Sequence, residues 1–180
     1  MDDEDILPNR EIALELIKKL KLPLSIRYHS LAVAKKAVKI SKQIPNMDLN
    51  LKLIEIGSLL HDIGRTRTHG FDHGIEGGKI LKSRGFPESV LRICERHILG
   101  GLDKEDAKFV GLPVKDYLPE TIEEKIVCLA DKYMTGKKEV SVEERFEKWM
   151  VKYGRTEILL KARRRIEKIQ SEIRKLMDTK

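Results

Sequence analysis

The stretch LLHDIGRTRTHGFDHGIEGG, residues 59–78, holds three of the chain's five histidines together with two aspartates. Imidazole nitrogens and carboxylate oxygens are ligands that proteins offer to divalent transition metals. The pair His61-Asp62 ends an apolar run, and His69, Asp72 and His73 follow within twelve residues. A His-Asp dipeptide alone is weak evidence, because short motifs also occur by chance. The stretch is therefore either part of a metal site or a solvated loop.

Three more residues of the same types fall on segments with an apolar helical face. His29 is in register with an apolar stripe, His97 ends a second apolar segment, and Asp131 follows KIVCLA on a third. A lone histidine on such a face is ordinarily a hydrogen-bonded core residue, and a lone aspartate is ordinarily a cap or an ion-pair partner. Several such groups in one small core are better explained together, by a divalent cation near the centre of a helical bundle.

The elements that would position these residues are helices, because helical periodicity is strong and strand signals are weak. Helices are expected over residues 9–21, 25–43, 48–63, 73–84, 87–100, 121–134, 141–152 and 155–178. Gly64 can end the third helix, and Thr121 with Glu124 has the spacing of a capping box. Residues 100–119 are expected to be irregular around one short helical turn. The prediction is an all-α helical bundle with a metal site in its core, forming one domain over residues 1–180.

Composition and charge argue against a membrane-spanning or secreted protein. The chain has 180 residues, 41% hydrophobic and 36% charged, and no apolar run approaches the ~20 residues that a membrane span needs. The N-terminus MDDEDILPNR lacks an apolar signal core, which predicts a cytoplasmic protein without membrane association. Cys94 and Cys128 are then expected to be reduced, buried thiols. Of the net charge of +7, +5 lies in residues 155–180, which hold nine Lys/Arg and four Asp/Glu.

The order His29, then His61-Asp62, then a distant Asp131 resembles the HD superfamily of metal-dependent phosphohydrolases. HDIG at 61–64 and the following HGIEGGKIL resemble the subgroup named for that tetrapeptide. The resemblance implies an HD-type helical bundle with a family-like core over residues 25–134 and a helical extension over 141–178. It implies that those four residues are the ligands of a first metal ion.

The resemblance also bears on a second metal ion. His73 and His97 stand at positions similar to those of additional ligands in two-metal members of the superfamily. We therefore favour two ions over one, with Asp62 bridging them. His69 matches no family position and is expected to lie in a loop, at most near the substrate. The metal is expected to be Mn, Fe, Co, Ni or Zn, and a His/Asp site does not choose among them.

Departures from related patterns narrow the expected chemistry. The acidic residues that follow the HD pair in alarmone hydrolases are missing, and so is the Gly-Tyr-Pro signature of cyclic-di-GMP phosphodiesterases. Arg65 replaces the usual lysine after HDIG and offers a planar fork to phosphate oxygens. Arg65 and Lys132 are therefore candidate substrate-binding residues, and Asp62 and Arg65 are candidate catalytic residues. Solvated loop charge is the alternative for Arg65 and the preferred interpretation of Arg67, and Lys132 could equally point to solvent.

These residues predict the hydrolysis of a phosphate ester or anhydride. A bound metal lowers the pKa of coordinated water, so that hydroxide can attack phosphorus near neutral pH, and Asp62 could orient or deprotonate that water. The family resemblance points to a small phosphorylated substrate, in particular a nucleotide. Residues 100–120 are expected to form a wall of the pocket, where Lys104, Lys115 and Tyr117 are either substrate contacts or plain surface.

Two other functions remain open from the sequence. One is a catalytically silent, metal-stabilised module for ligand binding or signalling. The other, less favoured, is a nucleic-acid-binding protein that uses the basic residues of the last helix, Lys161, Arg163, Arg164, Arg165 and Lys168. That helix also has an apolar face, which favours internal packing or a homodimer over nucleic-acid binding.

Overall fold

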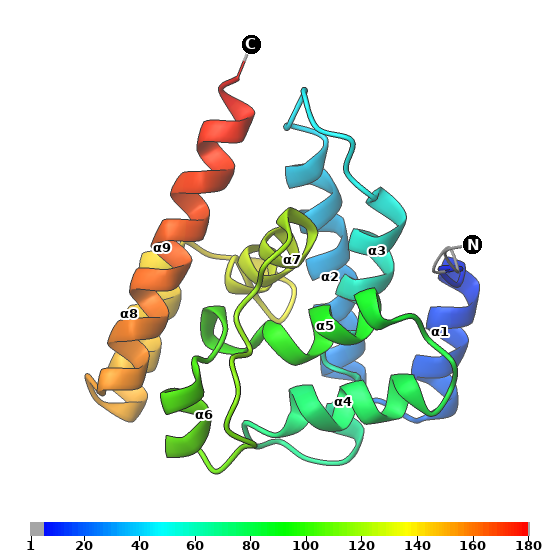
Figure 1. Cartoon of the computed structure of the whole chain (residues 1–180), viewed down its shortest axis with the longest axis horizontal. Coiled ribbons are helices and arrows are strands. Elements are labelled where there is room, and N and C mark those ends of the chain that lie inside the picture. The colour runs from blue at the N-terminus through cyan, green and yellow to red at the C-terminus, as the bar shows by residue number, and fades with distance from the viewer. Residues whose placement is uncertain (1–5, 180) are drawn as a thin grey trace.

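The structure is a computed structural model that describes residues 6–179, and it is almost entirely helical (Figure 1). The N-terminal part comprises α1 (Arg10–Lys19), α2 (Leu24–Ser41), α3 (Leu51–Leu60), the 3₁₀ turn η1 (Ile63–Thr66), α4 (His73–Lys82) and α5 (Glu88–Arg96). The remainder comprises the 3₁₀ turn η2 (Ile98–Gly100), α6 (Lys104–Phe109), α7 (Ile122–Lys132), β1 (Met134–Thr135), β2 (Lys138–Glu139), α8 (Val142–Tyr153) and α9 (Glu157–Met177). The expected all-α fold class is confirmed.

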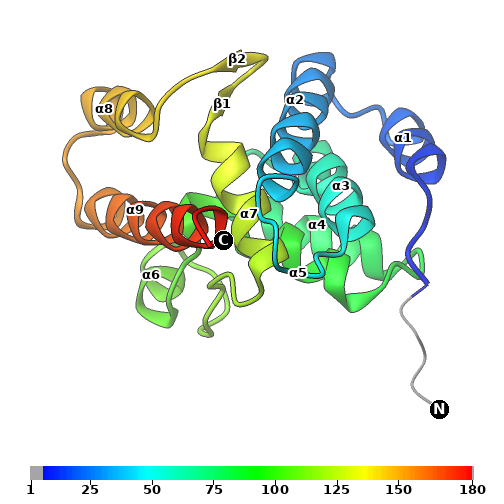
Figure 2. The same ribbon diagram turned by 90° about the horizontal axis from the view of Figure 1, so that it is seen from above.

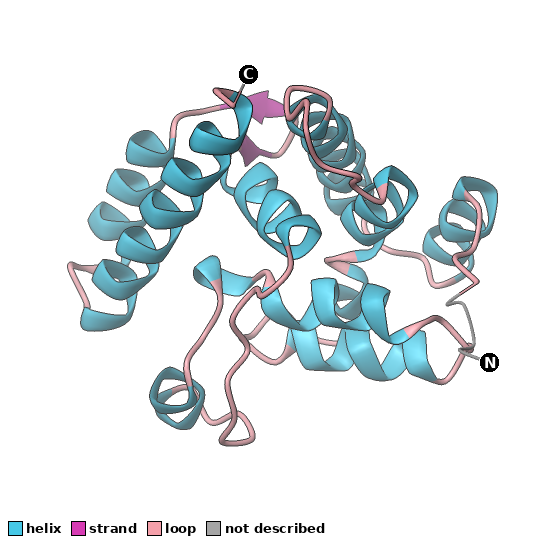
Figure 3. Ribbon diagram, turned by 45° about the horizontal axis from the view of Figure 1, so that its top comes forward, coloured by secondary structure: helices cyan, strands magenta, loops and turns pink. Residues whose placement is uncertain are grey.

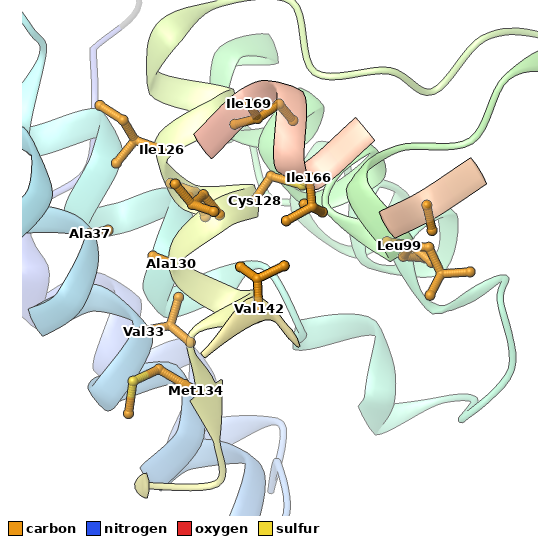
Figure 4. Close-up of a cluster of buried hydrophobic side chains, with 14 of the residues drawn as sticks. Val33, Ala37, Leu99, Ile126, Cys128, Ala130, Met134, Val142, Ile166 and Ile169 are labelled. Atoms are coloured by element: carbon orange, nitrogen blue, oxygen red, sulfur yellow. The ribbon is translucent and has the colours of Figure 1, made fainter. Parts of the chain in front are cut away.

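Helix α7 lies in the middle of the fold. It packs against α2, α3 and α5 on one side and against α9 on the other, which Figure 2 shows from above. Because neighbours cover it on several sides, the run from Ile126 to Lys132 is buried throughout. Side chains from α2, α7 and α9 meet around this helix in the main hydrophobic core, seen close up in Figure 4. The central position of α7 brings Asp131 and Lys132 into the interior.

The predicted helices are present, but several of their ends differ from the expectation. Helix α3 ends at Leu60 rather than near residue 63, so His61 is its C-cap and Gly64 lies inside η1. Helix α5 ends at Arg96, and the chain turns sharply at Leu99, whose φ is 52°. The helix expected to reach Gly100 is therefore broken beside His97.

Two local features were not expected from the sequence. Residues 134–139 form a short antiparallel hairpin, in which Met134 pairs with Glu139 and Gly136 takes a positive φ at the turn (Figure 3). The capping box at Thr121 is only half formed. The Thr121 hydroxyl accepts a hydrogen bond from the Glu124 amide, but the buried Glu124 carboxylate accepts from the Glu120 amide and from Arg96 rather than from the Thr121 amide.

Helices α8 and α9 form an antiparallel pair beside α7. A full capping box between Ser141 and Glu144 starts α8, and the apolar face of α9 is buried through Leu159, Ala162, Ile166, Ile169 and Ile173. This face packs into the chain's own core, which decides for internal packing over the homodimer that we expected as an alternative. Both cysteines are buried, as expected.

Two expectations concern location in the cell. Within residues 6–179, no helix combines the length and the apolar character needed to cross a bilayer. The acidic start of the chain, on which the prediction of a cytoplasmic protein depends, lies partly outside the described residues, since the description begins at residue 6.

Candidate metal centre

Six side chains from different elements meet at the C-terminal end of α7. Their positions follow from how the elements end: His61 and Asp62 come directly after α3, and His97 lies between α5 and η2. His73 is the first residue of α4, His29 lies on α2, and Asp131 lies one residue before the end of α7. All six residues that we predicted as metal ligands are therefore brought together.

A close contact between η1 and α4 sets the distance between the HD pair and His73. A Cβ atom on Gly64 would lie 1.8 Å from the carbonyl oxygen of His73 and 2.6 Å from the amide nitrogen of Gly77. Both of those atoms belong to the backbone and cannot rotate away. Glycine at position 64 is therefore required for close approach rather than for ending α3.

Asp62 lies between two groups of histidines. Its Oδ1 atom is 3.2 Å from Nε2 of His73 and 3.4 Å from Nε2 of His97. Its Oδ2 atom is 3.6 Å from Nε2 of His61. Each carboxylate oxygen thus faces its own set of imidazole nitrogens.

Asp131 closes the other side of the centre. Its Oδ1 atom is 2.9 Å from Nε2 of His29 and 3.8 Å from Nε2 of His61, and its Oδ2 atom is paired with Lys132. His61 therefore lies between the two carboxylates. Candidate ligand atoms lie within 4.8 Å of one another in each of three groups, which are His29/His61/Asp62, His61/His97/Asp131 and Asp62/His73/His97.

The histidine rings are held so that Nε2 points into the centre. Nδ1 lies 2.7 Å from the Ser58 carbonyl in His61, 2.6 Å from the Gly70 carbonyl in His73, and 2.7 Å from the Cys94 carbonyl in His97. A carbonyl can only accept, so Nδ1 carries the hydrogen and Nε2 presents a lone pair. This is the orientation of metal-ligating histidines.

The lone pairs on Nε2 lack suitable partners within the described chain. Nε2 of His61 is buried and has no hydrogen-bond partner among residues 6–179. The Nε2 atoms of His73 and His97 face each other at 3.2 Å, where two lone pairs repel. A bound cation would satisfy these nitrogens and Asp62 together, because burying unpartnered acceptors is costly. The residues therefore fit a divalent metal site.

The charges at the centre also suit a cation. Burial lowers the pKa of His61, and it lowers the pKa of His97 to about 4, so both rings are neutral near pH 7. Burial alone would raise the pKa of Asp62, but the imidazoles clustered around it keep this pKa well below its usual value. Burial opposes ionisation of Asp131 in the same way, and the charge of Lys132 outweighs it. The site therefore combines ionised carboxylates with neutral imidazoles.

His29 differs from the other ligands. Burial lowers its pKa, but the hydrogen bond and the charge of Asp131 outweigh this effect and give a raised pKa. Its Nδ1 lies 3.3 Å from the Gly136 carbonyl, a longer contact than those of the other three rings. The hairpin that we missed in the sequence thus provides the carbonyl beside this ring.

The two predicted cationic residues lie beside the centre. Nε of Arg65 donates to Oδ1 of Asp62 at 2.9 Å, and its side chain stays 29% exposed, so it can also reach a ligand in the cavity. Lys132 is 1% exposed and donates to the His97 carbonyl at 3.0 Å, so the alternative that it points to solvent is wrong. Arg67 is paired with Glu76 at the surface, as expected for a loop charge.

The centre opens into a cavity of about 480 Å³. Among the predicted residues, His29, Asp62, Arg65, His73, His97, Asp131 and Lys132 line it, and so does His69. The expected wall from residues 100–120 is wrong, because no residue between 100 and 130 lines the cavity. Tyr117 is buried elsewhere and donates to the Pro113 carbonyl, and Lys115 lies over its ring.

The wall opposite the ligands comes from α8 and the start of α9, through Arg145, Trp149, Tyr153, Ile158 and Leu159. Sequence reasoning missed this wall. The aromatic residues at 149 and 153 are visible in the sequence, but nothing in the local pattern relates them to the histidines and aspartates of the centre.

Comparison with known proteins places the chain in a family. The sequence matches the family described as HD domain over residues 26–136, more than half of its length. An uncharacterized protein from Methanocaldococcus jannaschii is 41% identical over 169 residues, which cover 93% of this chain and 98% of that protein. The HD domain of the L. monocytogenes phosphodiesterase PgpH has the same fold, with a TM-score of 0.51 at 19% identity, covering 90% of this chain and 98% of that one.

Other relatives are longer proteins. A tRNA (cytidine(56)-2'-O)-methyltransferase from Picrophilus torridus is 37% identical over 167 residues, which are 93% of this chain but only 47% of that enzyme. A Thermoplasma volcanium protein of the same name is 39% identical over 77% of this chain and 40% of its own length. The chain spans about half the length of these two relatives or less. With the family match and the buried His/Asp centre together, the chain belongs to the HD domain family.

Proposed function

We propose that the protein is a metal-dependent phosphohydrolase that cleaves a phosphate ester or anhydride of a nucleotide. The observation that carries this proposal is the set of buried imidazoles whose Nδ1 atoms face backbone carbonyls while their Nε2 atoms converge on Asp62 and Asp131. The protein PgpH, whose HD domain has a similar fold, is a phosphodiesterase, which supports the same reaction class. A bound divalent cation would supply an acidified water as nucleophile and neutralise charge on the phosphate.

We further propose two metal positions bridged by Asp62. The support is that Oδ1 faces His73 and His97, whereas Oδ2 faces His61. His29, His61, Asp62 and Asp131 would hold one ion, and Asp62, His73 and His97 the other. A carboxylate whose two oxygens face separate imidazole sets is suited to bridging two ions.

The residues around the ligands have separate roles in this proposal. Arg65 and Lys132 balance the charges of Asp62 and Asp131, so any bound divalent cation makes this end of the cavity net positive. That charge suits the oxygens of a phosphate. Arg65 would contact the phosphate through the guanidinium nitrogens that Asp62 does not use, and Asp62 would orient the attacking water. Lys132 would hold Asp131 ionised and add positive charge near the phosphate.

Two observations support a nucleotide as the substrate. A related HD domain has been solved in complex with cyclic-di-AMP, and it shares the fold at a TM-score of 0.52. The cavity, at about 480 Å³, is within the range of about 300–1,000 Å³ typical of small-molecule sites.

The basic residues of α9 give little support to the nucleic-acid alternative. Lys161 and Arg165 pair with Asp103 and Asp106, and Arg163 pairs with Glu147 and Glu167, so much of the basic charge is balanced within the chain. Two relatives are named as tRNA methyltransferases, which is the observation in favour of an RNA-related role. A gel-shift titration with tRNA at 50 and 200 mM salt tests for nucleic-acid binding, since phosphate contacts make such binding strongly salt-dependent.

The test of the proposed function is metal content per chain and phosphatase activity in the wild type and in Asp62→Ala. We expect about two metals in the wild type, with loss of metal and a fall in activity of at least about 100-fold in the variant. Asp48→Ala is the control, since Asp48 is exposed in a loop. Metal without any turnover on a panel of nucleotides with added Mn²⁺ would favour the silent binding module. One metal per chain with full activity would contradict the bridged pair.

A further inference from the structure

The wall of the cavity that faces the metal centre lies outside the part of the chain matched by the HD family. The match ends at residue 136, whereas Arg145, Trp149 and Tyr153 lie on α8. These three residues are spaced by four, so they share one face of that helix. All three line the same cavity as Asp62 and Arg65.

Arg145 and Trp149 form one unit on this wall. The guanidinium carbon of Arg145 lies 4.7 Å from the centroid of a Trp149 ring, which is a cation–π contact. One terminal nitrogen of Arg145 donates to the Met134 carbonyl and to the Thr135 hydroxyl, both at 2.8 Å. Its Nε is buried and finds no hydrogen-bond partner anywhere in the described part of the chain. The guanidinium is thus held in place through Nη1 and by stacking on Trp149.

The lining of the cavity combines two kinds of surface. Carboxylates, imidazoles and Arg65 form the polar part, whereas Phe71, Trp149, Tyr153, Ile158 and Leu159 add an apolar and aromatic part. A phosphate group alone would occupy only a small part of about 480 Å³. Nucleobases stack on aromatic rings and on arginine guanidinium planes, and both surfaces line this cavity.

We propose that the α8 wall, Arg145, Trp149 and Tyr153, is the base-binding subsite of the substrate, so that the enzyme selects nucleotides over sugar phosphates of the same phosphate chemistry. Arg145 contacts the base through its planar face, and Trp149 supports the guanidinium from behind. Tyr153, 58% exposed, lies at the rim. The inference rests on the proposed function only in placing the substrate phosphate beside the metal-binding residues.

Binding can be measured without turnover, because Trp149 is the only tryptophan in the chain. Its fluorescence, excited at a wavelength where nucleotides do not absorb, reports on the wall itself. With the metal-loaded protein, we expect AMP, GMP, CMP or UMP to change the emission saturably. Ribose 5-phosphate and inorganic phosphate should leave it nearly unchanged. Equal responses to nucleotides and ribose 5-phosphate, or no response to any of them, would overturn the subsite.

Variants of α8 give a second readout. Arg145→Ala and Trp149→Leu should raise the KM for the nucleotide substrate by about tenfold or more, as expected for loss of a stacking surface, with little change for ribose 5-phosphate. Trp149→Phe should restore most of the nucleotide preference, since it keeps an aromatic ring. Lys148→Ala and Val151→Ala are matched controls on the same helix, where both residues are exposed. Thermal unfolding of each variant checks that α8 still docks.

The outcomes separate this inference from the proposed function. Turnover with equal KM effects on nucleotide and sugar phosphate would leave a phosphohydrolase without a base subsite. Saturable nucleotide-specific fluorescence without any turnover would keep the subsite and overturn the hydrolase. Variants that unfold cannot be used for KM, and the wild-type titration then decides alone.

Discussion

The ligand wall (His29, Asp62, His73, His97 and Asp131, with the buried His61 beside them) and the α8 wall (Arg145, Trp149 and Tyr153) differ in how their side chains are held. On the ligand wall, His61 is fully buried and Asp62 is 5% exposed, and backbone carbonyls orient the rings. On the α8 wall, Tyr153 is 58% exposed, and the whole helix is positioned by the docking of its partner α9. The first wall therefore depends on buried hydrogen bonds, whereas the second depends on the packing of one helix against another.

The close contact behind the ligand wall gives the largest expected effect. Gly64→Ala places a methyl group 1.8 Å from the His73 carbonyl oxygen, so η1 and α4 must separate. We expect a loss of at least about 3 kcal/mol in the free energy of unfolding, at the upper end of overpacking effects. Urea denaturation measures it.

The control for this prediction is Gly70→Ala, where the nearest atom to the new methyl group is a side-chain oxygen of Asp72 at 2.7 Å that can move. It should cost less than about 1 kcal/mol. Equal stability of Gly64→Ala and the wild type would break the comparison, because the ligand wall would then not depend on close backbone packing.

The docking of α9 supports the α8 wall from behind. Ile166→Ala removes a fully buried side chain beside Gly100, and we expect a cost of about 2–4 kcal/mol in the free energy of unfolding. Val151→Ala, at a position 86% exposed, should change it by less than about 0.5 kcal/mol. Denaturation followed by both Trp149 fluorescence and circular dichroism tests whether the two walls unfold together. Two separate transitions would mean that the α8 wall is an independent unit.

Within the ligand wall, a single substitution should distinguish the metal position at Oδ1 of Asp62 from the position at Oδ2. His73→Ala removes an imidazole that faces only Oδ1, so it should weaken one metal position by at least about tenfold and leave the ion beside His29 in place. Metal content per chain after dialysis measures this. The same measurement on His69→Ala should show unchanged metal content, since His69 lines the cavity but belongs to none of the ligand groups. Loss of all metal in His73→Ala would argue for a single site.

The smallest effect concerns the cysteines behind the ligand wall. The thiol of Cys94 lies 3.1 Å from the His61 carbonyl, and burial raises its pKa well above the usual value. Burial raises the pKa of Cys128 to about 11. Because a raised pKa lowers the thiolate fraction at pH 8, both thiols should react several-fold more slowly with Ellman's reagent in the folded chain than in denaturant. Rapid reaction of Cys94 would show that the ligand wall opens locally.

Much of the ligand wall could be predicted from residue types and their order. His29, Asp131 and the HD pair stand on or beside apolar helical faces, and a polar group in such a place calls for a partner. The helix ends were harder to place. His97 was expected within a helix, but Leu99 takes a left-handed conformation that no local signal announces. The capping spacing at Thr121 was real, yet the Glu124 carboxylate accepts from the Glu120 amide and from Arg96, a partner on another helix that the local pattern does not reveal.

The α8 wall shows the opposite case. Arg, Trp and Tyr spaced by four on a helix are compatible with ordinary surface or core packing, so their types carry no assignment. The segment that we expected as a wall, residues 100–120, contains cations and aromatic residues as well. Only the direction in which α8 leaves the hairpin at 134–139, together with the docking of α9 on α7, decides which of the two segments lines the cavity beside Asp62.

The sequence by itself determined the helical class, the six candidate ligands and the basic residue beside them, because metal chemistry restricts ligands to a few residue types and burial restricts their positions. The tertiary structure alone decided that Asp62 turns one oxygen to each histidine group, that Gly64 sits against α4, and that α8 closes the cavity. These are contacts between elements far apart in the chain, and they depend on packing directions that local patterns do not encode.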